Sequence, residues 1–110
     1  MSDLNYLVAK NIFKLDTVKY LGQYGTFNED GEFSDIVDYS KDMNGTFEIV
    51  KKLQYLGFVF TMRAVRYDYG ARFADLTTGK SIVVESEGDP NEAICKAGLE
   101  AMEYFESDRR

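Results

Sequence analysis

The chain has 110 residues, of which 45% are hydrophobic and 15% aromatic, and it carries a formal net charge of −6 at pH 7. This length and apolar content suit one folded domain with a single core, and they argue against wholesale disorder. With one cysteine and no histidine, the chain cannot form an intramolecular disulfide and lacks the ligands of the usual zinc sites. We therefore expect a single domain, 1–110, without a metal or a cofactor.

No apolar run approaches the roughly 18 residues of a membrane-spanning helix, and no signal peptide is recognised at the N-terminus. We expect a soluble, unprocessed, intracellular protein. Most of its negative charge lies in residues 28–42. This segment contains six carboxylates and one basic residue, Lys41, so its formal net charge is −5. Such a field repels phosphate backbones and anionic lipids, so neither nucleic acid nor a membrane is an expected partner.

The first predicted elements are a helix and a hairpin. Ser2 can cap a helix over 3–13, whose apolar residues recur at helical spacing: Leu4, Leu7, Val8 and Ile12. Between 17 and 39, β-branched and aromatic residues flank NEDG at 28–31, a pattern typical of two strands joined by a turn. Gly22 and Gly25 suggest a bulge or an irregular first arm.

The second predicted helix begins at Ser40 or Asp42, both of which can cap it, and ends before Gly57, which suits the left-handed residue after a helix. Its predicted apolar stripe consists of Met43, Phe47, Val50, Leu53 and Leu56.

Three strands are predicted next, at 58–67, 71–76 and 81–86. The connections between them, DYG and TTGK, are short and contain glycine, as hairpin turns often do. The sequence therefore predicts an antiparallel meander.

The last predicted helix, 89–105, has the clearest start signal in the chain. Asp89 as N-cap, Pro90 at the first helical position and Glu92 near the end of the first turn all agree. Small and apolar residues share its inner face, which predicts close packing on a sheet: Ile94, Ala97, Gly98, Ala101 and Phe105.

Cys95 lies near the edge of this face. A nucleophilic thiolate needs a neighbouring base or cation, but the chain has no histidine and Asp89 and Glu92 occupy the same turn. These carboxylates also stand where a phosphate would bind a helix start. We therefore expect a buried, unreactive thiol, and no catalytic residue.

The order helix, three strands, helix is also that of the double-stranded RNA-binding domain. That domain grips phosphates with lysines at the start of its last helix, whereas here 89–96 read DPNEAICK. Acidic residues replace the basic clamp, so RNA binding is not expected.

A more specific resemblance is to the phage ABA sandwich domain, a small family found in bacteriophage and prophage genomes. YSKDMNGTFEIVKKL at 39–53 resembles the family's tyrosine-serine-x-aspartate helix start, and DPNEAICKAGLEAM at 89–102 resembles its closing helix. LNYLVAKNIF at 4–13 resembles its opening helix. The resemblance covers 4–13 and 39–105, whereas 17–38 departs from it, because family members often carry tryptophans there and this chain has none.

The resemblance implies a phage origin, an α/β/α layered fold and no established catalytic residues. Together with the elements above, it predicts an α+β protein with helices packed on an antiparallel sheet of three to five strands, in the order α-β-β-α-β-β-β-α. Residues 17–39 are expected as a hairpin-like insertion, and 40–105 as helix, three-strand meander and helix. A phage origin places the protein in the host bacterial cytoplasm.

An enzyme is not expected. Carboxylate pairs such as Glu29 and Asp30 lie in a polar hairpin, where neither burial nor a fixed partner would prepare them for proton transfer. The glycines are scattered at turns rather than gathered in a nucleotide-binding loop.

The main function hypothesis is a binding protein that inhibits or redirects a host protein, for instance a defence protein. Carboxylates speed association with a cationic partner, and interleaved aromatic residues supply desolvated contacts, although these aromatics could instead anchor the hairpin to the core. The candidate partner-binding residues are Glu29, Asp30, Glu32, Phe33, Asp35 and Asp38.

Two alternatives stay open. One is a protein that sequesters a nucleotide-type immune signalling molecule, because arginines fork onto phosphates and tyrosines stack on bases. Its candidate residues are Arg63, Arg66, Tyr67, Tyr69, Arg72 and Lys80. The other is a minor phage structural or assembly protein, for which the sequence carries no mark. A homo-oligomer is compatible with each hypothesis.

Overall fold

A computed structural model describes residues 3–20, 22–27, 29–39, 41–66 and 68–107. Three helices and two three-stranded antiparallel sheets follow one another in the order α-β-β-β-α-β-β-β-α. The expected α+β class, with an antiparallel sheet and packed helices, is confirmed. None of the helices in the described part of the chain is long and apolar enough to cross a membrane.

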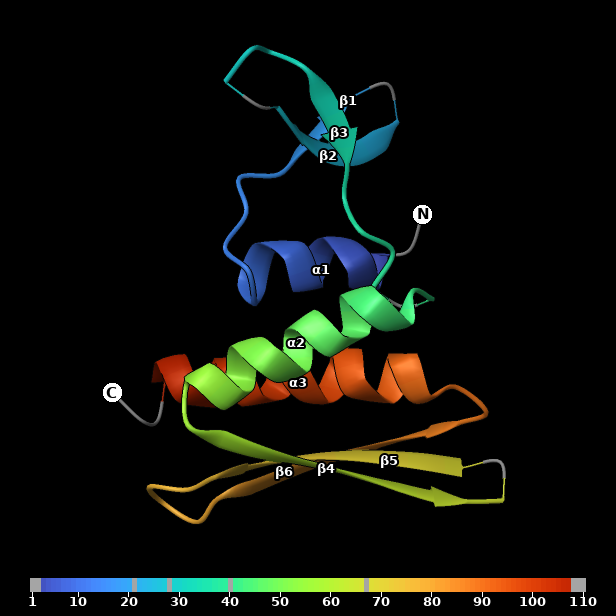
Figure 1. Ribbon diagram of the computed structural model, residues 1–110, viewed down its shortest axis with the longest axis vertical. Helices are drawn as coiled ribbons and strands as arrows, with labels where there is room; N and C mark the ends of the chain where they lie inside the picture. Colours follow the sequence, from blue (N-terminus) through green and yellow to red (C-terminus); the bar gives the residue numbers. More distant parts are fainter. Residues whose placement is uncertain (1–2, 21, 28, 40, 67, 108–110) are drawn as a thin grey trace.

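The elements run as follows: α1 Asp3–Asn11, β1 Val18–Tyr20, β2 Gln23–Phe27, β3 Phe33–Asp35, α2 Met43–Tyr55, β4 Phe58–Val65, β5 Asp68–Asp75, β6 Ser81–Glu87 and α3 Pro90–Ser107. We call β1–β3 the outer sheet and β4–β6 the main sheet. Figure 1 shows the three helices between these two sheets along the long axis of the molecule. The layering therefore differs from the predicted α/β/α order, in which a sheet lies between helices.

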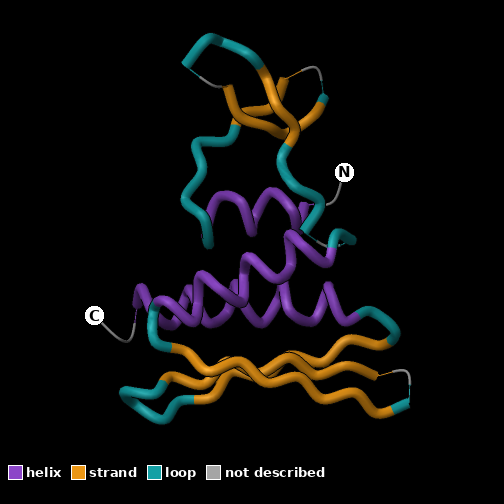
Figure 2. Tube along the Cα trace, in the orientation of Figure 1, coloured by secondary structure: helices purple, strands orange, loops and turns teal. Residues whose placement is uncertain are grey.

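The main sheet is the expected meander, with strand order β4-β5-β6. Helix α2 contacts β4, and α3 contacts β5 and β6, so the helices cover one face of the sheet (Figure 2). Phe58, Phe73 and Ile82 are buried on that face, whereas Val59 and Val83 are exposed on the other. None of the described helices covers the other face of the main sheet (Figure 2), which we call the open face.

Helix α3 lies at the centre of the fold, because it contacts the main sheet as well as α1 and α2. A Cβ added at Gly98 would lie 2.7 Å from Ile49 Cγ2 of α2 and 3.1 Å from Ile12 Cδ1. The close approach predicted from the small residues is therefore made, at Gly98, to the other helices rather than to the sheet.

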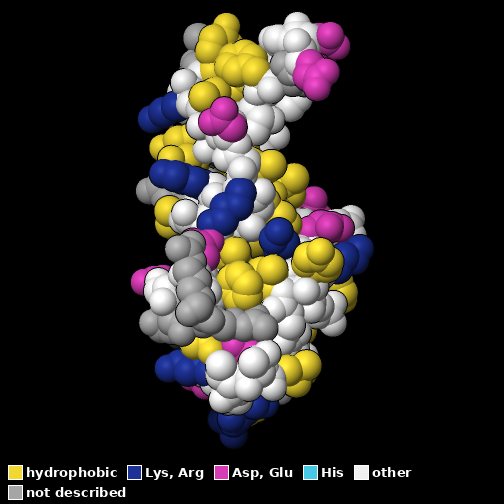
Figure 3. Space-filling model, turned by 90° about the vertical axis from the view of Figure 1, so that its left-hand side faces the viewer, with side chains coloured by type: hydrophobic (Ala, Val, Ile, Leu, Met, Phe, Trp, Pro, Cys, Tyr) yellow, Lys and Arg dark blue, Asp and Glu magenta, His cyan; other side chains and the backbone are white. Residues whose placement is uncertain are grey.

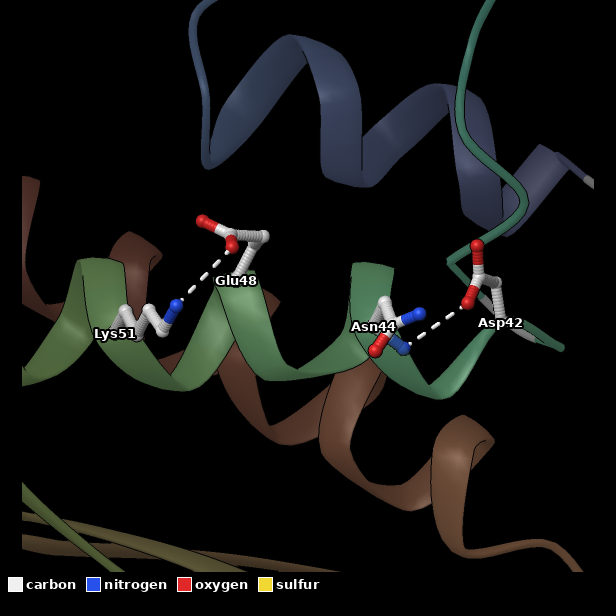
Figure 4. Close-up of polar contacts among 4 residues, drawn as sticks. All are labelled: Asp42, Asn44, Glu48 and Lys51. Atoms are coloured by element: carbon white, nitrogen blue, oxygen red, sulfur yellow. Dashed lines mark hydrogen bonds and ion pairs between the residues drawn. The ribbon is translucent and has the colours of Figure 1, made fainter.

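The ends of α2 and α3 follow the sequence signals. Asp42 Oδ1 accepts a hydrogen bond from Asn44 N at 3.0 Å (Figure 4), and Asp89 Oδ1 accepts one from Glu92 N at 3.1 Å. Gly57 has a φ of 101° just after α2, the left-handed conformation expected there. Ser2, the predicted cap of the first helix, and Ser40, the alternative cap of the second, lie outside the described residues.

Helix α2 is rotated relative to the predicted stripe. Met43 and Phe47 are 50% and 56% exposed, whereas Thr46 and Ile49 are fully buried. Thr46 Oγ1 donates to the Tyr39 carbonyl oxygen at 2.6 Å, which fixes the first turn with Thr46 facing inward. The predicted stripe was wrong for the two helical turns that contain Met43 and Phe47. A threonine whose hydroxyl bonds to a backbone oxygen can be buried, but it is not counted as apolar in a sequence pattern.

The turn between β4 and β5 also lies elsewhere than predicted. Residues 68–70 (DYG) belong to β5 and pair with residues 63–65 of β4. The connection between β4 and β5 begins at Arg66 instead, directly after Val65, and Arg66 adopts a φ of 58° there. Short hairpin turns require positive φ, which sequence reasoning assigns to glycine, so the non-glycine turn was missed.

The outer sheet has one strand more than the predicted hairpin. Strands β2 and β3 flank the expected turn, of which residues 29–31 are described, and β1 pairs with β2 across a turn that includes Gly22. Gly22 has a φ of 81° and serves this turn rather than a bulge. A strand of three residues has too short a pattern to be recognised in the sequence.

Candidate functional site

Three aromatic rings gather on one face of the outer sheet. Tyr20, Phe27 and Phe33, which we call the aromatic cluster, have centroids separated by 5.2–5.6 Å. Phe27 and Phe33 are direct cross-strand partners, and Phe33 lies over Gly25, whose added Cβ would be 2.4 Å from the ring. Tyr20 and Phe27 are each 48% exposed. Figure 3 shows hydrophobic side chains at this outer end of the molecule.

Carboxylates lie next to the aromatic cluster in the sequence and on the outer sheet. Glu29 and Asp30 lie in the turn after Phe27, and Glu32 directly precedes Phe33; all are exposed. Asp35 pairs with Gly25, and because alternate residues of a strand share a face, it points to the same side as the cluster. Acidic side chains are visible beside the hydrophobic ones in Figure 3. Five of the six predicted partner-binding residues thus lie together on the outer sheet and its turn.

Asp38 lies apart from these five residues. Its Oδ1 accepts a hydrogen bond from Asn5 Nδ2 at 2.8 Å, and Asn5 is only 2% exposed. The Asp38 carbonyl oxygen also accepts from the backbone N–H groups of Lys41 and Asp42. Asp38 therefore ties α1 to the segment that leads into α2.

The opposite face of the outer sheet holds it to the helices. Tyr24 stacks on Tyr6 of α1 with centroids 4.4 Å apart. Lys10 lies 5.6 Å from the centroid of Tyr6, and Lys19 lies 5.6 Å from that of Tyr24. This attachment uses the side of the sheet away from the aromatic cluster, so the cluster does not serve as the anchor.

The six residues predicted for a nucleotide pocket do not come together. Arg63 and Arg72 share the open face of the main sheet, whereas Arg66 lies in the β4–β5 turn. Lys80 lies at the other end of the sheet, before β6, and Tyr69 points to the opposite side of β5 from Arg72, because they are an odd number of residues apart. Tyr67 lies outside the described residues.

A shallow hollow of about 310 Å³ nevertheless lies between Arg63 and Arg72. Its other walls come from residues that sequence reasoning did not single out: Thr61, Met62, Gly70, Val83 and Glu85. The alternation of residues along each predicted strand could have placed most of these on one face, but the pairing register was needed to set Gly70 between Arg63 and Glu85.

Cys95 is fully buried, as expected. Its Sγ donates to the Tyr39 carbonyl oxygen at 3.4 Å. Burial raises the pKa of this thiol to about 12, and the negative charges of Asp89, Asp38 and Glu92 act in the same direction. A thiol of this kind is a poor nucleophile. Among the described residues, no group of three or more histidine, cysteine or carboxylate side chains is placed to hold a metal ion.

The family model of the phage ABA sandwich domain matches residues 6–99. The chain belongs to this family. The match includes 17–38, the segment whose lack of tryptophan had set it apart, so the outer sheet lies within the family's domain. The protein is therefore a member of a phage protein family, as the resemblance implied.

A crystal structure of a phage protein from Bacillus cereus ATCC 14579 is similar to this phage ABA sandwich domain, with a TM-score of 0.66 over 90% of each chain. The two sequences are 22% identical, so the likeness concerns the fold alone. The comparison with curated proteins finds no match.

Proposed function

We propose that this chain is a non-enzymatic phage binding protein, whose outer sheet contacts a basic surface of a host bacterial protein and thereby inhibits or redirects it. The observation that carries the proposal is the aromatic cluster, half exposed, with exposed carboxylates in the adjoining turn and on β3. Tyrosine and phenylalanine are enriched at the centres of protein interfaces, where they fill pockets of the partner.

Two structural features support a binding role for the aromatic cluster. First, the outer sheet is already attached through Tyr24 and Tyr6 on its other face. Second, Phe33 occupies the space above Gly25, and the three rings contact one another, so the apolar surface is formed without a partner. A rigid apolar surface loses little conformational entropy on binding, which favours affinity.

The charge around the cluster supports a basic partner. Glu29 and Asp35 are exposed on either side of the rings and form none of the ion pairs in the described part of the chain. Such charges steer a cationic surface toward the cluster and exclude acidic proteins. Within a phage-infected cell, a host protein with a basic functional surface is the partner that this chemistry fits.

The test compares two variants with the same change of net charge. Glu29→Lys/Asp35→Lys reverses charge beside the aromatic cluster, and Glu100→Lys/Glu103→Lys reverses it on α3, where both side chains are exposed. Each tagged protein is incubated with host lysate, and the captured proteins are quantified by mass spectrometry. We expect a basic protein that the wild type and the α3 variant retain, that the outer-sheet variant loses, and whose capture weakens with salt.

A third variant separates the apolar contact from the charges. Phe27→Ser removes one exposed ring and no charge, so capture of the same protein should also fall at least tenfold. If the outer-sheet variants retain every captured protein at the level of the α3 variant, the outer sheet is not the binding surface and the proposal is wrong.

A further inference from the structure

The open face of the main sheet carries two guanidinium groups on neighbouring strands. Arg63 pairs with Gly70 and Thr61 pairs with Arg72, so Arg63 and Arg72 are diagonal neighbours on one face. Diagonal neighbours in an antiparallel pair are roughly 7–8 Å apart, with their Cβ atoms somewhat closer, and both side chains are exposed. None of the ion pairs in the described part of the chain involves either arginine.

Arg72 is held in place by a neighbouring side chain. Its Nε donates to Ser81 Oγ of β6 at 3.1 Å. This bond occupies one N–H of the guanidinium and leaves the two terminal nitrogens for another acceptor. Arginine binds phosphate with such a fork of parallel N–H groups.

Gly70 makes room between the charged groups. It pairs with Arg63 on one side and Glu85 on the other, and these three residues line the hollow of about 310 Å³ together with Arg72, Thr61 and Val83. A second hollow of about 160 Å³ shares Arg63, Gly70 and Glu85. Because Gly70 has no side chain, backbone atoms form the floor of the hollow between Arg63, Arg72 and Glu85.

We propose that this face binds a small organic phosphate that also carries an N–H donor. Arg63 and Arg72 bind the phosphate, Glu85 accepts from the N–H group, and the methyl groups of Thr61 and Val83 contact the rest of the ligand. The larger hollow lies at the lower end of the range of about 300–1,000 Å³ typical of small-molecule sites, which suits one mononucleotide-sized molecule. This site is separate from the outer sheet, so its existence does not depend on the function proposed above.

Three probes separate the parts of the ligand. AMP has both the phosphate and an N–H donor, ribose 5-phosphate lacks the donor, and adenosine lacks the phosphate. Isothermal titration at low ionic strength is expected to show saturable one-to-one binding of AMP in the millimolar range or tighter, at least threefold weaker binding of ribose 5-phosphate, and no binding of adenosine.

Matched variants locate the site. Arg63→Ala and Arg72→Ala should each weaken AMP binding at least tenfold. Arg66→Ala removes the same charge from the β4–β5 turn, outside the hollow, and should leave the affinity unchanged. Gly70→Val tests the space itself: an added Cβ would lie no closer than 3.7 Å to its neighbours, and a β-branched residue suits a strand, so this variant should remain folded while binding AMP at least tenfold more weakly.

Circular dichroism and thermal melting of each variant show whether the fold is kept. The proposal is overturned if neither AMP nor ribose 5-phosphate binds the wild type, if adenosine binds as well as AMP, or if Arg66→Ala weakens binding as much as Arg63→Ala and Arg72→Ala do.

Discussion

Tyr6 of α1 and Tyr24 of β2 stack with their ring planes inclined by 22° and their centroids 4.4 Å apart. This pair joins the outer sheet to the helices, and it is flanked by Lys10 on one ring and Lys19 on the other. The stack lies on the face of the outer sheet opposite the aromatic cluster. The side chains that attach the sheet to the helices are therefore different from those that form its exposed aromatic surface.

We predict that Tyr24→Ala loosens the outer sheet while the remaining fold stays intact. The aromatic pair contributes roughly 0.5–1.5 kcal/mol beyond the area it buries, and three short strands have little core of their own. Hydrogen exchange should accelerate at least tenfold within residues 18–35 and stay unchanged in β4–β6. Tyr20→Ala, which removes an exposed ring of the aromatic cluster, is the control and should leave the attachment in place.

The fold was predictable where local signals agree with tertiary packing. The start of α3 was predicted from Asp89, Pro90 and Glu92, because the signals for a helix start lie in residues that are adjacent in sequence. The φ of Arg66, by contrast, is imposed by the pairing of β4 with β5, which no local signal reveals. The inward position of Thr46 likewise depends on the carbonyl of Tyr39, seven residues away.

The two surfaces were predictable to different degrees. The carboxylates around Phe33 are close in sequence, so their grouping survives in the structure, and only Asp38 departs through its bond to Asn5. The arginines come from separate strands, and only the register shows that Arg63 and Arg72 share a hollow whereas Arg66 does not. Residues that are distant in sequence come together only through the pairing of strands. Composition and periodicity do not determine that pairing.

We predict that Gly98→Ala destabilises the protein. Helix propensity alone favours this change by about 1 kcal/mol, but the added Cβ would lie 2.7 Å from Ile49 Cγ2. Overpacking of a close contact costs roughly 1–3 kcal/mol, so the net free energy of unfolding should decrease in urea titrations. Gly70→Ala is the matched control, since its Cβ meets nothing closer than 3.7 Å. An increase in stability for Gly98→Ala would show that α2 can move away from α3 at no cost.

We predict that Tyr104→Phe weakens the connection between α3 and the main sheet. Tyr104 Oη donates to Asp75 Oδ2 at 2.8 Å, and Asp75 is 1% exposed. Loss of a donor to a buried carboxylate costs about 1–3 kcal/mol, which thermal unfolding would detect as a lower Tm. Tyr55→Phe removes a hydroxyl from a side chain that is 86% exposed, and its Tm should match that of the wild type.

We predict that stability falls at alkaline pH in part through Cys95. Its pKa is raised from 9.0 to about 12 in the folded protein, first by burial, so the folded state holds this proton more tightly than the unfolded state does. The resulting stabilisation is complete below pH 9 and is lost as the pH rises toward 12, with a slope of up to about 1.4 kcal/mol per pH unit. Burial also raises the pKa of Tyr39 above 10.0, which adds to the fall at higher pH.

Urea titrations between pH 8 and pH 10 measure this slope for the wild type and for Cys95→Ala. The variant has a cavity and therefore a lower stability throughout, but its free energy of unfolding should decline less steeply above pH 9. Equal slopes for the two proteins would mean that the thiol loses its proton in the folded state as readily as in the unfolded state. The thiol would then reach solvent despite its burial and its hydrogen bond to the Tyr39 carbonyl oxygen, and the argument that Cys95 is a poor nucleophile would no longer hold.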